Sequence, residues 1–275
     1  MNTTFKIVPA LNNENACNLL LEISESNVAV FCYSTYPFTA QGFYYFSVTE
    51  NDKGINFANN LKATLQAETL HTAHFNQIDI FYNFADTTLV PTTFFKEAEK
   101  DNVASLMFGN KTDSISLHET ITELDIENIY AVPNSLLQVM DEIYPTAKKH
   151  HSLSKIIQPT VGTTLLTTIY EKDIRLVLMN KNNLLLAAYF DYNTPEDVCY
   201  HMLNACQQNS ISAEIVHVIL NGMIDTNSNL YKEIYKFFLN INTDILPKKV
   251  LLAEGFDGLS EHYFSPLVKL AKCVS

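Results

Sequence analysis

The side chains that could do chemistry in this 275-residue chain are scattered, and few of them share a useful spacing. His71 and His74 lie three residues apart, so one helical turn could present both to a metal ion. No third ligand accompanies them at a recognisable spacing, and a histidine near a helix C-terminus is also favoured by the helix dipole. Cys199 and Cys206 lie seven residues apart on one predicted helix face, which is typical of core residues. Neither pair predicts a metal site or a catalytic site.

Sequence motifs of known chemistry are also missing. The chain contains 7 glycines, and none forms the GxGxxG or GxxxxGK[ST] pattern that holds phosphates. There is no GxSxG, and no Ser/His/Asp or Cys/His set can be assembled from the sequence order. We therefore expect no catalytic residue and no cofactor, with ATP and Mg²⁺ disfavoured.

Composition and charge exclude several classes of protein. Asp and Glu number 30 against 18 Lys and Arg, which gives a net charge of −12. The largest basic clusters are Lys148-Lys149 and Lys248-Lys249, so the basic face that general nucleic-acid binding needs is absent. The apolar runs are too short to span a bilayer, and residues 1–10 lack the apolar core of a signal peptide. The 5 cysteines are an odd number within apolar patterns, which favours reduced thiols and a cytoplasmic protein without membrane insertion.

The predicted elements follow one order, and that order occurs twice. Three strands in a meander, then an amphipathic helix and a further strand, are predicted at residues 18–24, 28–34, 42–48, 56–70 and 77–82. The same order recurs at residues 164–170, 174–179, 184–190, a helix that begins after Thr194 at Pro195, and 215–220. Since a chance repeat of the whole order is improbable, we predict a tandem duplication of one β-β-β-α-β-α unit.

The segments outside the two meanders are harder to assign. Residues 86–158 predict a strand ending at Pro91, a helix from Thr92 or Thr93 through Ala98, a variable stretch, a strand at 129–132 and a helix opened by Pro133-Asn134. A solvated linker is expected near residues 150–159, and it divides the chain into domains 1–155 and 156–275. A helix at 229–239, a strand at 250–253 and a helix at 265–272 complete the predicted order.

Three segments, together with this architecture, resemble a known family. They are residues 89–98 (LVPTTFFKEA), 130–137 (YAVPNSLL) and 190–203 (FDYNTPEDVCYHML). They look like those of an uncharacterised bacterial family with a duplicated actin-like ATPase fold, and the resemblance covers roughly residues 18–270. It implies an α/β protein of two ribonuclease-H-like domains, each a mixed sheet with a β-meander and flanking helices. It implies no activity, because that family has no established function.

Active actin-like ATPases carry an Asp and a Gly-rich loop in the first hairpin of each meander, where backbone amides hold the phosphates. Here the first hairpin turns through Ser24 to Asn27, without Gly or Asp. The second turns through Glu171 to Asp173, without Gly and with two carboxylates that would repel a triphosphate. The resemblance therefore implies at most a degenerate nucleotide cleft built from these turns, and ATP hydrolysis is not expected.

The family's third element is a glycine pair after a late strand, which approaches the adenosine. Asn221-Gly222 stands at that place, and a turn glycine with positive φ is the preferred interpretation over a residual nucleotide pocket. Glu22 lies where ribonuclease-H-type nucleases keep a metal-binding carboxylate. No further acid pairs with it by spacing, so a cross-strand or solvent-facing Glu22 is preferred.

Aromatic residues are abundant in two places, at Phe43–Phe46 and in the helix with Tyr231, Tyr235 and Phe238. A large core in each domain explains them, while an aromatic surface would mark a protein interface at that helix. The leading hypothesis is a catalytically silent actin-like protein that binds a partner protein or its own copy. The alternatives are a nucleotide-binding or small-metabolite-binding protein that uses the interdomain cleft, and a metal-dependent nuclease built on Glu22.

Overall fold

The computed structural model describes residues 1–9 and 17–275 of the chain, which form two compact units. Unit 1 consists of Met1–Lys155, Lys249–Asp257 and Val274–Ser275, and unit 2 of Ile156–Lys248 and Gly258–Cys273. The chain thus leaves unit 1 after Lys155 and returns to it twice near its end. These returns were not predicted.

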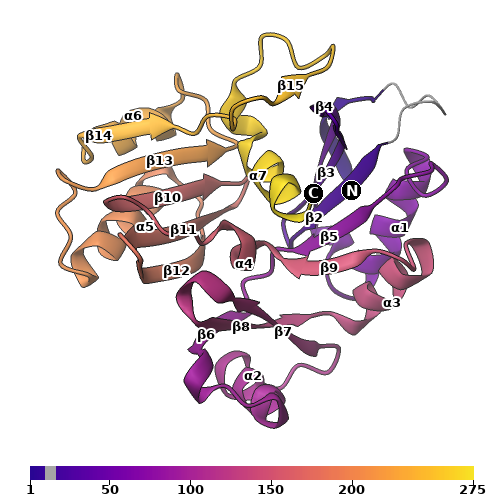
Figure 1. The fold of residues 1–275 in the computed structure, drawn as a ribbon, viewed down its shortest axis with the longest axis horizontal. Coiled ribbons are helices and arrows are strands. Elements are labelled where there is room, and N and C mark those ends of the chain that lie inside the picture. Colours follow the sequence, from indigo (N-terminus) through magenta and orange to yellow (C-terminus); the bar gives the residue numbers. More distant parts are fainter. Residues whose placement is uncertain (10–16) are drawn as a thin grey trace. The chain divides into compact units, whose positions relative to one another are not determined.

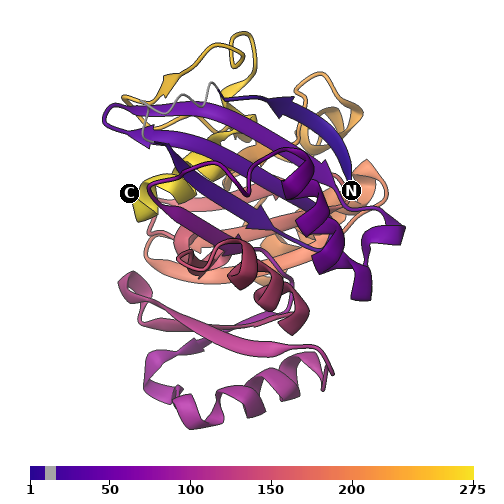
Figure 2. The same ribbon diagram turned by 90° about the vertical axis from the view of Figure 1, so that its right-hand side faces the viewer.

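The main sheet of unit 1 is built on an antiparallel meander extended by parallel strands (Figures 1 and 2). The order along the sheet is β1-β4-β3-β2-β5-β9, with β15 also pairing with β4. The strands are β1 (Asn2–Ile7), β2 (Asn18–Ile23), β3 (Asn27–Thr35), β4 (Phe38–Ser47), β5 (Ile78–Tyr82), β9 (Lys148–His151) and β15 (Leu251–Leu252). Helices α1 (Phe57–Ala67) and α3 (Asn134–Ile143) bury apolar faces in the same core as the meander, so their 3.6-residue periodicity is explained.

A second, three-stranded sheet in unit 1 follows β5. It consists of β6 (Thr87–Pro91), β7 (Ile115–Ile121) and β8 (Ile126–Val132) in the order β6-β8-β7, and α2 (Lys100–Phe108) lies on it (Figure 1). The helix predicted from Thr92 through Ala98 is wrong, because two short 3₁₀ turns occupy Thr92–Phe94 and Glu97–Glu99 and α2 begins only at Lys100. Strand β7 replaces part of the predicted variable stretch.

The expectation that His150 and His151 lie in a solvated linker is wrong, although the chain passes from unit 1 to unit 2 within residues 150–159. Residues 148–151 form β9, which pairs in parallel with β5, and Ser152–Ile156 form α4. His151 is fully buried and His150 is half-buried. A Lys-Lys-His-His strand carries no apolar alternation, so no periodicity could have indicated it.

Unit 2 contains one five-stranded sheet in the order β12-β11-β10-β13-β14. Its strands are β10 (Thr163–Ile169), β11 (Asp173–Asn180), β12 (Asn183–Asp191), β13 (His217–Gly222) and β14 (Asn240–Thr243). β10, β11 and β12 are antiparallel, and β13 and β14 continue in parallel from β10. Helices α5 (Pro195–Gln208) and α6 (Asn229–Tyr235) contribute to its core, and α7 (Ser265–Val274) ends the chain.

The two sheets share one strand order, since β4-β3-β2-β5-β9 corresponds to β12-β11-β10-β13-β14. This agreement confirms the predicted fold class of two similar mixed sheets, each with a meander and flanking helices. Within the described ranges 1–9 and 17–275, no helix combines the length and apolarity that crossing a membrane would require.

Candidate functional site

The first predicted phosphate-binding turn joins β2 to β3 in unit 1, and its own side chains occupy its backbone amides. Ser24 Oγ accepts hydrogen bonds from the amides of Ser26, at 3.3 Å, and Asn27, at 3.0 Å. The Ser24 amide donates to the Asn27 carbonyl at 2.9 Å. Because Ser24 and Asn27 are both buried, a phosphate could reach these amides only by breaking the turn.

The Asn27 side chain adds a second obstacle. Its Nδ2 donates to Ser26 Oγ at 2.8 Å, and its buried Oδ1 finds no hydrogen-bond donor in the described part of the chain. An oxygen acceptor at this position repels the oxygens of a phosphate. The turn therefore lacks the concave set of free amides that binds anions.

The second predicted turn joins β10 to β11 in unit 2 and presents carboxylates. The Tyr170 amide donates to the Asp173 carbonyl at 2.9 Å, and Tyr192 Oη donates to the Tyr170 carbonyl at 2.7 Å. Burial together with the negative charges of Asp173 and Glu171 raises the pKa of Tyr192. Burial is the larger cause of this shift, and the two carboxylates add to it. Their negative charges disfavour a polyphosphate at this turn.

The backbone conformation of unit 2 requires a glycine at position 222. Its φ is +80°, and a Cβ placed on it would lie 2.3 Å from the carbonyl oxygen of Ile169. The Met223 amide donates to this same oxygen at 2.6 Å. The glycine thus permits a close approach between the ends of β10 and β13, which accords with the preferred turn interpretation.

Asn221 is held in a buried polar cluster around Asp244. Its Nδ2 donates to Asp244 Oδ2 at 3.0 Å, and Ser265 Oγ donates to the same oxygen at 2.9 Å. Lys269 Nζ contacts both carboxylate oxygens, at 2.7 and 2.6 Å. The charge of Asp244 is therefore compensated within unit 2, as a buried carboxylate requires.

Four of the predicted residues lie together in unit 2. Glu171 and Asp173 follow the end of β10, and Gly222 is the register partner of Ile169, the last residue of that strand. The carboxylate turn and Asn221-Gly222 thus stand at the same end of two neighbouring strands. Ser24 and Asn27 belong to unit 1.

Glu22 and the histidine pair hold no metal site. Glu22 is buried and accepts a hydrogen bond from Ser152 Oγ at 2.7 Å, so the solvent-facing interpretation is wrong. His71 is exposed in the turns after α1. Among the described residues, no group of three or more His, Cys, Asp or Glu side chains could hold a metal ion.

Sequence reasoning missed a charged cluster in unit 1 that is centred on His150. His150 Nε2 lies 3.3 Å from Asp79 Oδ1, and its Nδ1 lies 3.1 Å from Glu119 Oε1. Lys155 Nζ lies 2.7 Å from the same Glu119 oxygen. Both ring nitrogens are engaged by carboxylates, so neither is free to take a proton from a substrate. The cluster joins β5, β7, β9 and α4.

The pKa values of this cluster follow from its charges. Burial alone would raise the pKa of Glu119, but hydrogen bonds from His150, from the His151 amide and from Lys155 lower it to about 2. Burial opposes a charge on His150, yet its hydrogen bonds to Asp79 and Glu119 outweigh burial and raise its pKa. No motif signals this set, because Asp79 and Glu119 are 40 residues apart and Glu119 and His150 are 31 residues apart.

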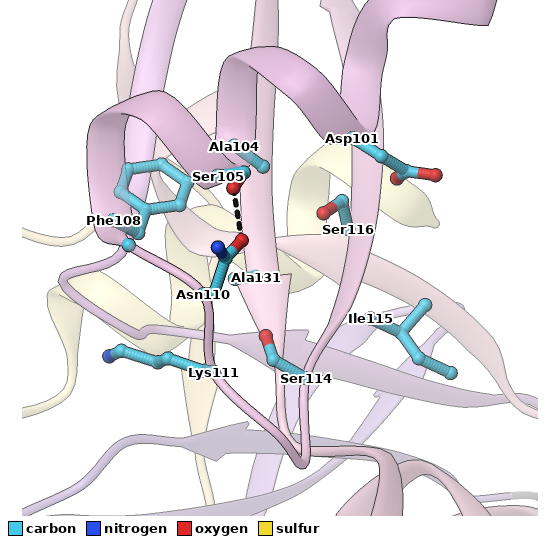
Figure 3. Close-up of a pocket in the computed structure, with 11 residues that line it drawn as sticks. Asp101, Ala104, Ser105, Phe108, Asn110, Lys111, Ser114, Ile115, Ser116 and Ala131 are labelled. Carbon is cyan, nitrogen blue, oxygen red and sulfur yellow. Dashed lines mark hydrogen bonds between the residues drawn. The ribbon is translucent and has the colours of Figure 1, made fainter.

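A pocket of about 320 Å³ opens between α2 and β7 in unit 1 (Figure 3). Ala104 and Phe108 line it from α2, and Ile115 and Ser116 line it from β7. Among the lining residues, Ser105 Oγ is hydrogen-bonded to Asn110 Oδ1. No sequence pattern indicated this pocket, since β7 was not predicted.

Exposed apolar side chains surround the same helix. Leu106 is 84% exposed and Met107 is 57% exposed, and Leu106 lies on the side of α2 opposite the buried Ala104. Phe94, just before α2, is 78% exposed. Apolar groups gathered this way on a surface mark interaction sites. We call the pocket and these three residues the α2 surface.

The aromatic residues predicted at an interface divide into two groups. Phe238 is fully buried in the core of unit 2, so it cannot present an interface on its own surface. Tyr231 and Tyr235 stack with ring centroids 6.3 Å apart, and Tyr235 is 62% exposed. Phe43 to Phe46 of the first meander are all buried core residues.

Comparisons with known proteins support the fold. A structure from Bacteroides thetaiotaomicron VPI-5482, described as having an actin-like ATPase fold and unknown function, is similar with a TM-score of 0.74 and 17% identity, over 86% of this chain and 93% of that one. A PilM–PilN type IV pilus biogenesis complex is similar with a TM-score of 0.60 and 12% identity, over 94% of this chain and 97% of that one. No curated protein matches the chain.

The similarity to these structures establishes an actin-like ATPase fold and, at such low identity, nothing further. A family model, by contrast, matches residues 9–241, which is most of the chain. This chain belongs to the family described as protein of unknown function (DUF3822).

Proposed function

We propose that this chain is a catalytically silent actin-like protein that acts as a protein-binding or assembly module. The observation that carries the proposal is the use of the β2–β3 turn amides by Ser24 Oγ. In a phosphate-binding loop those amides must be free to donate to the ligand. The carboxylates at the β10–β11 turn add repulsion at the corresponding place in unit 2.

The α2 surface is the binding face that the geometry favours. It combines a cavity of about 320 Å³ with three exposed apolar side chains. Residues 86–132, which contain it, carry nine acidic residues against three lysines. The complementary partner is a basic amphipathic helix, whose apolar side would cover Leu106 and Met107 while its cations face the acidic surroundings. The similar PilM–PilN structure is itself a complex of two proteins.

Thermal unfolding with nucleotides tests catalytic silence. A ligand that binds the folded chain stabilises it by RT ln(1 + [L]/Kd), or about 2.7 kcal/mol at a hundred times Kd. We expect no shift of Tm with millimolar Mg-ATP, ADP or GTP. A reproducible upward shift with any of them would favour the alternative, a nucleotide-binding protein that uses its cleft.

Photo-crosslinking in the native cell tests the α2 surface. A photoreactive amino acid at position 106 should yield an adduct with one protein, at a basic amphipathic segment of that protein. The same group at Leu239, which is 68% exposed in unit 2, serves as the matched control. Equal adducts at both positions, or none at position 106, would contradict the assignment of this surface.

A further inference from the structure

The outer edge of the meander is closed by additional strands in unit 1. β4 pairs with β3 on one side and, on the other, with β1 along Phe43–Ser47 and with β15 at Thr39–Ala40. Both edges of β4 are therefore satisfied by the chain itself. An unpaired strand edge offers hydrogen-bonding groups to any passing strand, and proteins usually cover it or protect it.

The corresponding edge in unit 2 is open. β12 pairs with β11 on one side, and over the described residues no strand pairs with its other side. Figure 1 shows β12 at the margin of its sheet. Among the described residues, further strands thus pair with this edge in one copy of the repeated meander and not in the other.

The sequence of β12 lacks the usual protection of an exposed edge. Seven consecutive apolar residues, Leu184–Phe190, lie between Asn183 and Asp191, with no lysine and no proline among them. Each of the seven is only partly buried. One bulge, near Leu185, interrupts the pairing with β11, and the segment from Leu186 to Asp191 is regular. Apolar edges without inward charges or prolines favour pairing with another strand.

The charges at the two ends of β12 select the partner. Lys181 is exposed in the turn before the strand, and Asp191 is exposed at its other end as the register partner of Asp173. The adjoining turn adds Glu171 and the exposed Lys172, which leaves two more acids than lysines at this end. When two copies of this strand pair antiparallel, the lysine end of each meets the acidic end of the other. A parallel arrangement would place like charges together, which is unfavourable.

We infer that β12 is the pairing edge of a two-fold symmetric dimer of this chain. Two β12 strands would align antiparallel and join the two five-stranded sheets of unit 2 into one continuous sheet. The contact is isologous, so it closes at two copies and forms no filament. The occupant of the edge is a second copy of this chain. The inference is independent of the α2 surface, which lies in unit 1.

The other exposed edge of unit 2 is a poorer candidate. β14 has only four residues, Asn240–Thr243, and three of them are Asn or Thr. The exposed Leu239 and Ile245 flank it outside the strand. A variant there therefore serves as a control that separates the two edges of one sheet.

Sedimentation velocity of the full chain over about a hundredfold range of concentration tests the dimer. We expect a reversible monomer–dimer equilibrium. Lys181→Glu should raise the dimer dissociation constant about threefold or more, because it creates two repulsive contacts per dimer. Lys232→Glu makes the same change of net charge on an exposed position of α6 and should leave the constant unchanged.

A variant in the middle of β12 completes the test. Ala187→Lys should raise the dissociation constant more than about tenfold, whereas Leu239→Lys beside β14 should not. Hydrogen exchange of the unaltered protein should show β12 amides that become protected as concentration rises, so the test stands even if the lysine variant folds poorly. A strict monomer at every concentration, or a dimer that resists both Lys181→Glu and Ala187→Lys, would overturn the inference.

Discussion

Gly222 shows how one missing methyl group can fix a local structure. An alanine Cβ at this position would lie 2.3 Å from the Ile169 carbonyl oxygen, which is a steric clash. The φ of +80° is also unfavourable for alanine. We expect Gly222→Ala to lower the free energy of unfolding by about 3 kcal/mol or more, measured by urea denaturation.

Gly258 is the matched control for that prediction. Its φ is +76°, but a Cβ there would have no atom within 4 Å. Gly258→Ala should therefore cost only the conformational part, about 1 to 2 kcal/mol. Equal losses in the two variants would mean that the close approach to Ile169 carries no energy.

The His150 cluster predicts a pH dependence of stability. In the folded protein the pKa of His150 is raised above its ordinary value of 6.5. Its protonated form therefore stabilises the fold fully below pH 6.5, and this stabilisation is lost as the pH rises through the raised pKa. The lowered pKa of Glu119 contributes above 4.5 and is lost as the pH falls toward about 2. Both contributions are complete between about pH 4.5 and 6.5.

His150→Gln isolates the histidine contribution, since glutamine keeps a donor but cannot be charged. We expect the difference in unfolding free energy between the parent protein and this variant to shrink as the pH rises above 6.5. His71→Gln removes an exposed imidazole and serves as the control. A difference for His150→Gln that stays constant from pH 5 to 9 would show that Asp79 and Glu119 do not stabilise its charge.

The candidate site could be predicted only in part from single residues. The missing glycines at Ser24–Asn27 and Glu171–Asp173 are visible in the letters, and they indicate turns unsuited to phosphate. Ser24 Oγ accepts hydrogen bonds from the Ser26 and Asn27 amides only in this turn conformation, which the sequence does not specify. The His150 cluster depends on pairing between strands distant in sequence, and no local pattern records such pairing.

At the scale of elements, α5 shows a start signal that sequence and structure share. Thr194 Oγ1 accepts a hydrogen bond from the Asp197 amide at 3.3 Å, and Asp197 Oδ2 accepts one from the Thr194 amide at 2.9 Å. Hydrogen bonds from the backbone amides of Asn193 and Thr194 lower the pKa of Asp197. This reciprocal capping box satisfies donors that would otherwise be unpaired at the helix start.

Removal of the cap should weaken α5 measurably. We expect Thr194→Ala to lower the free energy of unfolding by about 1 kcal/mol, and Thr194→Ser to restore most of it because serine retains the accepting oxygen. Urea denaturation of the three proteins provides the measurement. If the serine variant is as unstable as the alanine variant, the methyl packing of Thr194 matters and its hydrogen bond does not.

The elements that sequence predicted are those with a strong hydrophobic pattern. Both meanders, α3 and α5 bury continuous apolar faces, so their periods of two and 3.6 residues appear in the sequence. The missed strands β1, β7, β9 and β14 contain many His, Lys, Asn, Thr and Ser residues. They form because a neighbouring strand offers hydrogen bonds. The partner of β9 is the distant β5, whereas β7 pairs with β8, which follows it directly.

At the scale of the whole molecule, the duplication provides an internal comparison. Unit 1 and unit 2 share a strand order, but only unit 1 adds β1, β15 and the three-stranded sheet. Each of these additions covers a strand edge or creates a surface on unit 1. The sheet of unit 2 contains only the five strands that the two units share. Features unique to one unit, such as the α2 surface or the open edge of β12, are therefore where function beyond the shared scaffold should be sought.

The cysteines report on the whole molecule, because both units contain buried thiols. Cys17 and Cys32 lie in the core of unit 1, and Cys199 and Cys206 in that of unit 2, while Cys273 is exposed. Burial raises the pKa of Cys199 and of Cys206 to about 11. A hydrogen bond with Cys32 lowers the pKa of Cys17, but only 1% of Cys17 is exposed, so access limits its reaction.

We therefore expect a thiol reagent such as DTNB to label one cysteine rapidly in the native protein and all five after denaturation. Cys273→Ser should abolish the rapid phase and leave the slow phase unchanged. The slow phase then measures the opening of each core, and its rates for Cys32 and Cys199 separately tell whether the two units open together or one before the other. Rapid labelling of a second thiol at equilibrium would mean that one core is open to solvent in the native state, contrary to the burial of all four.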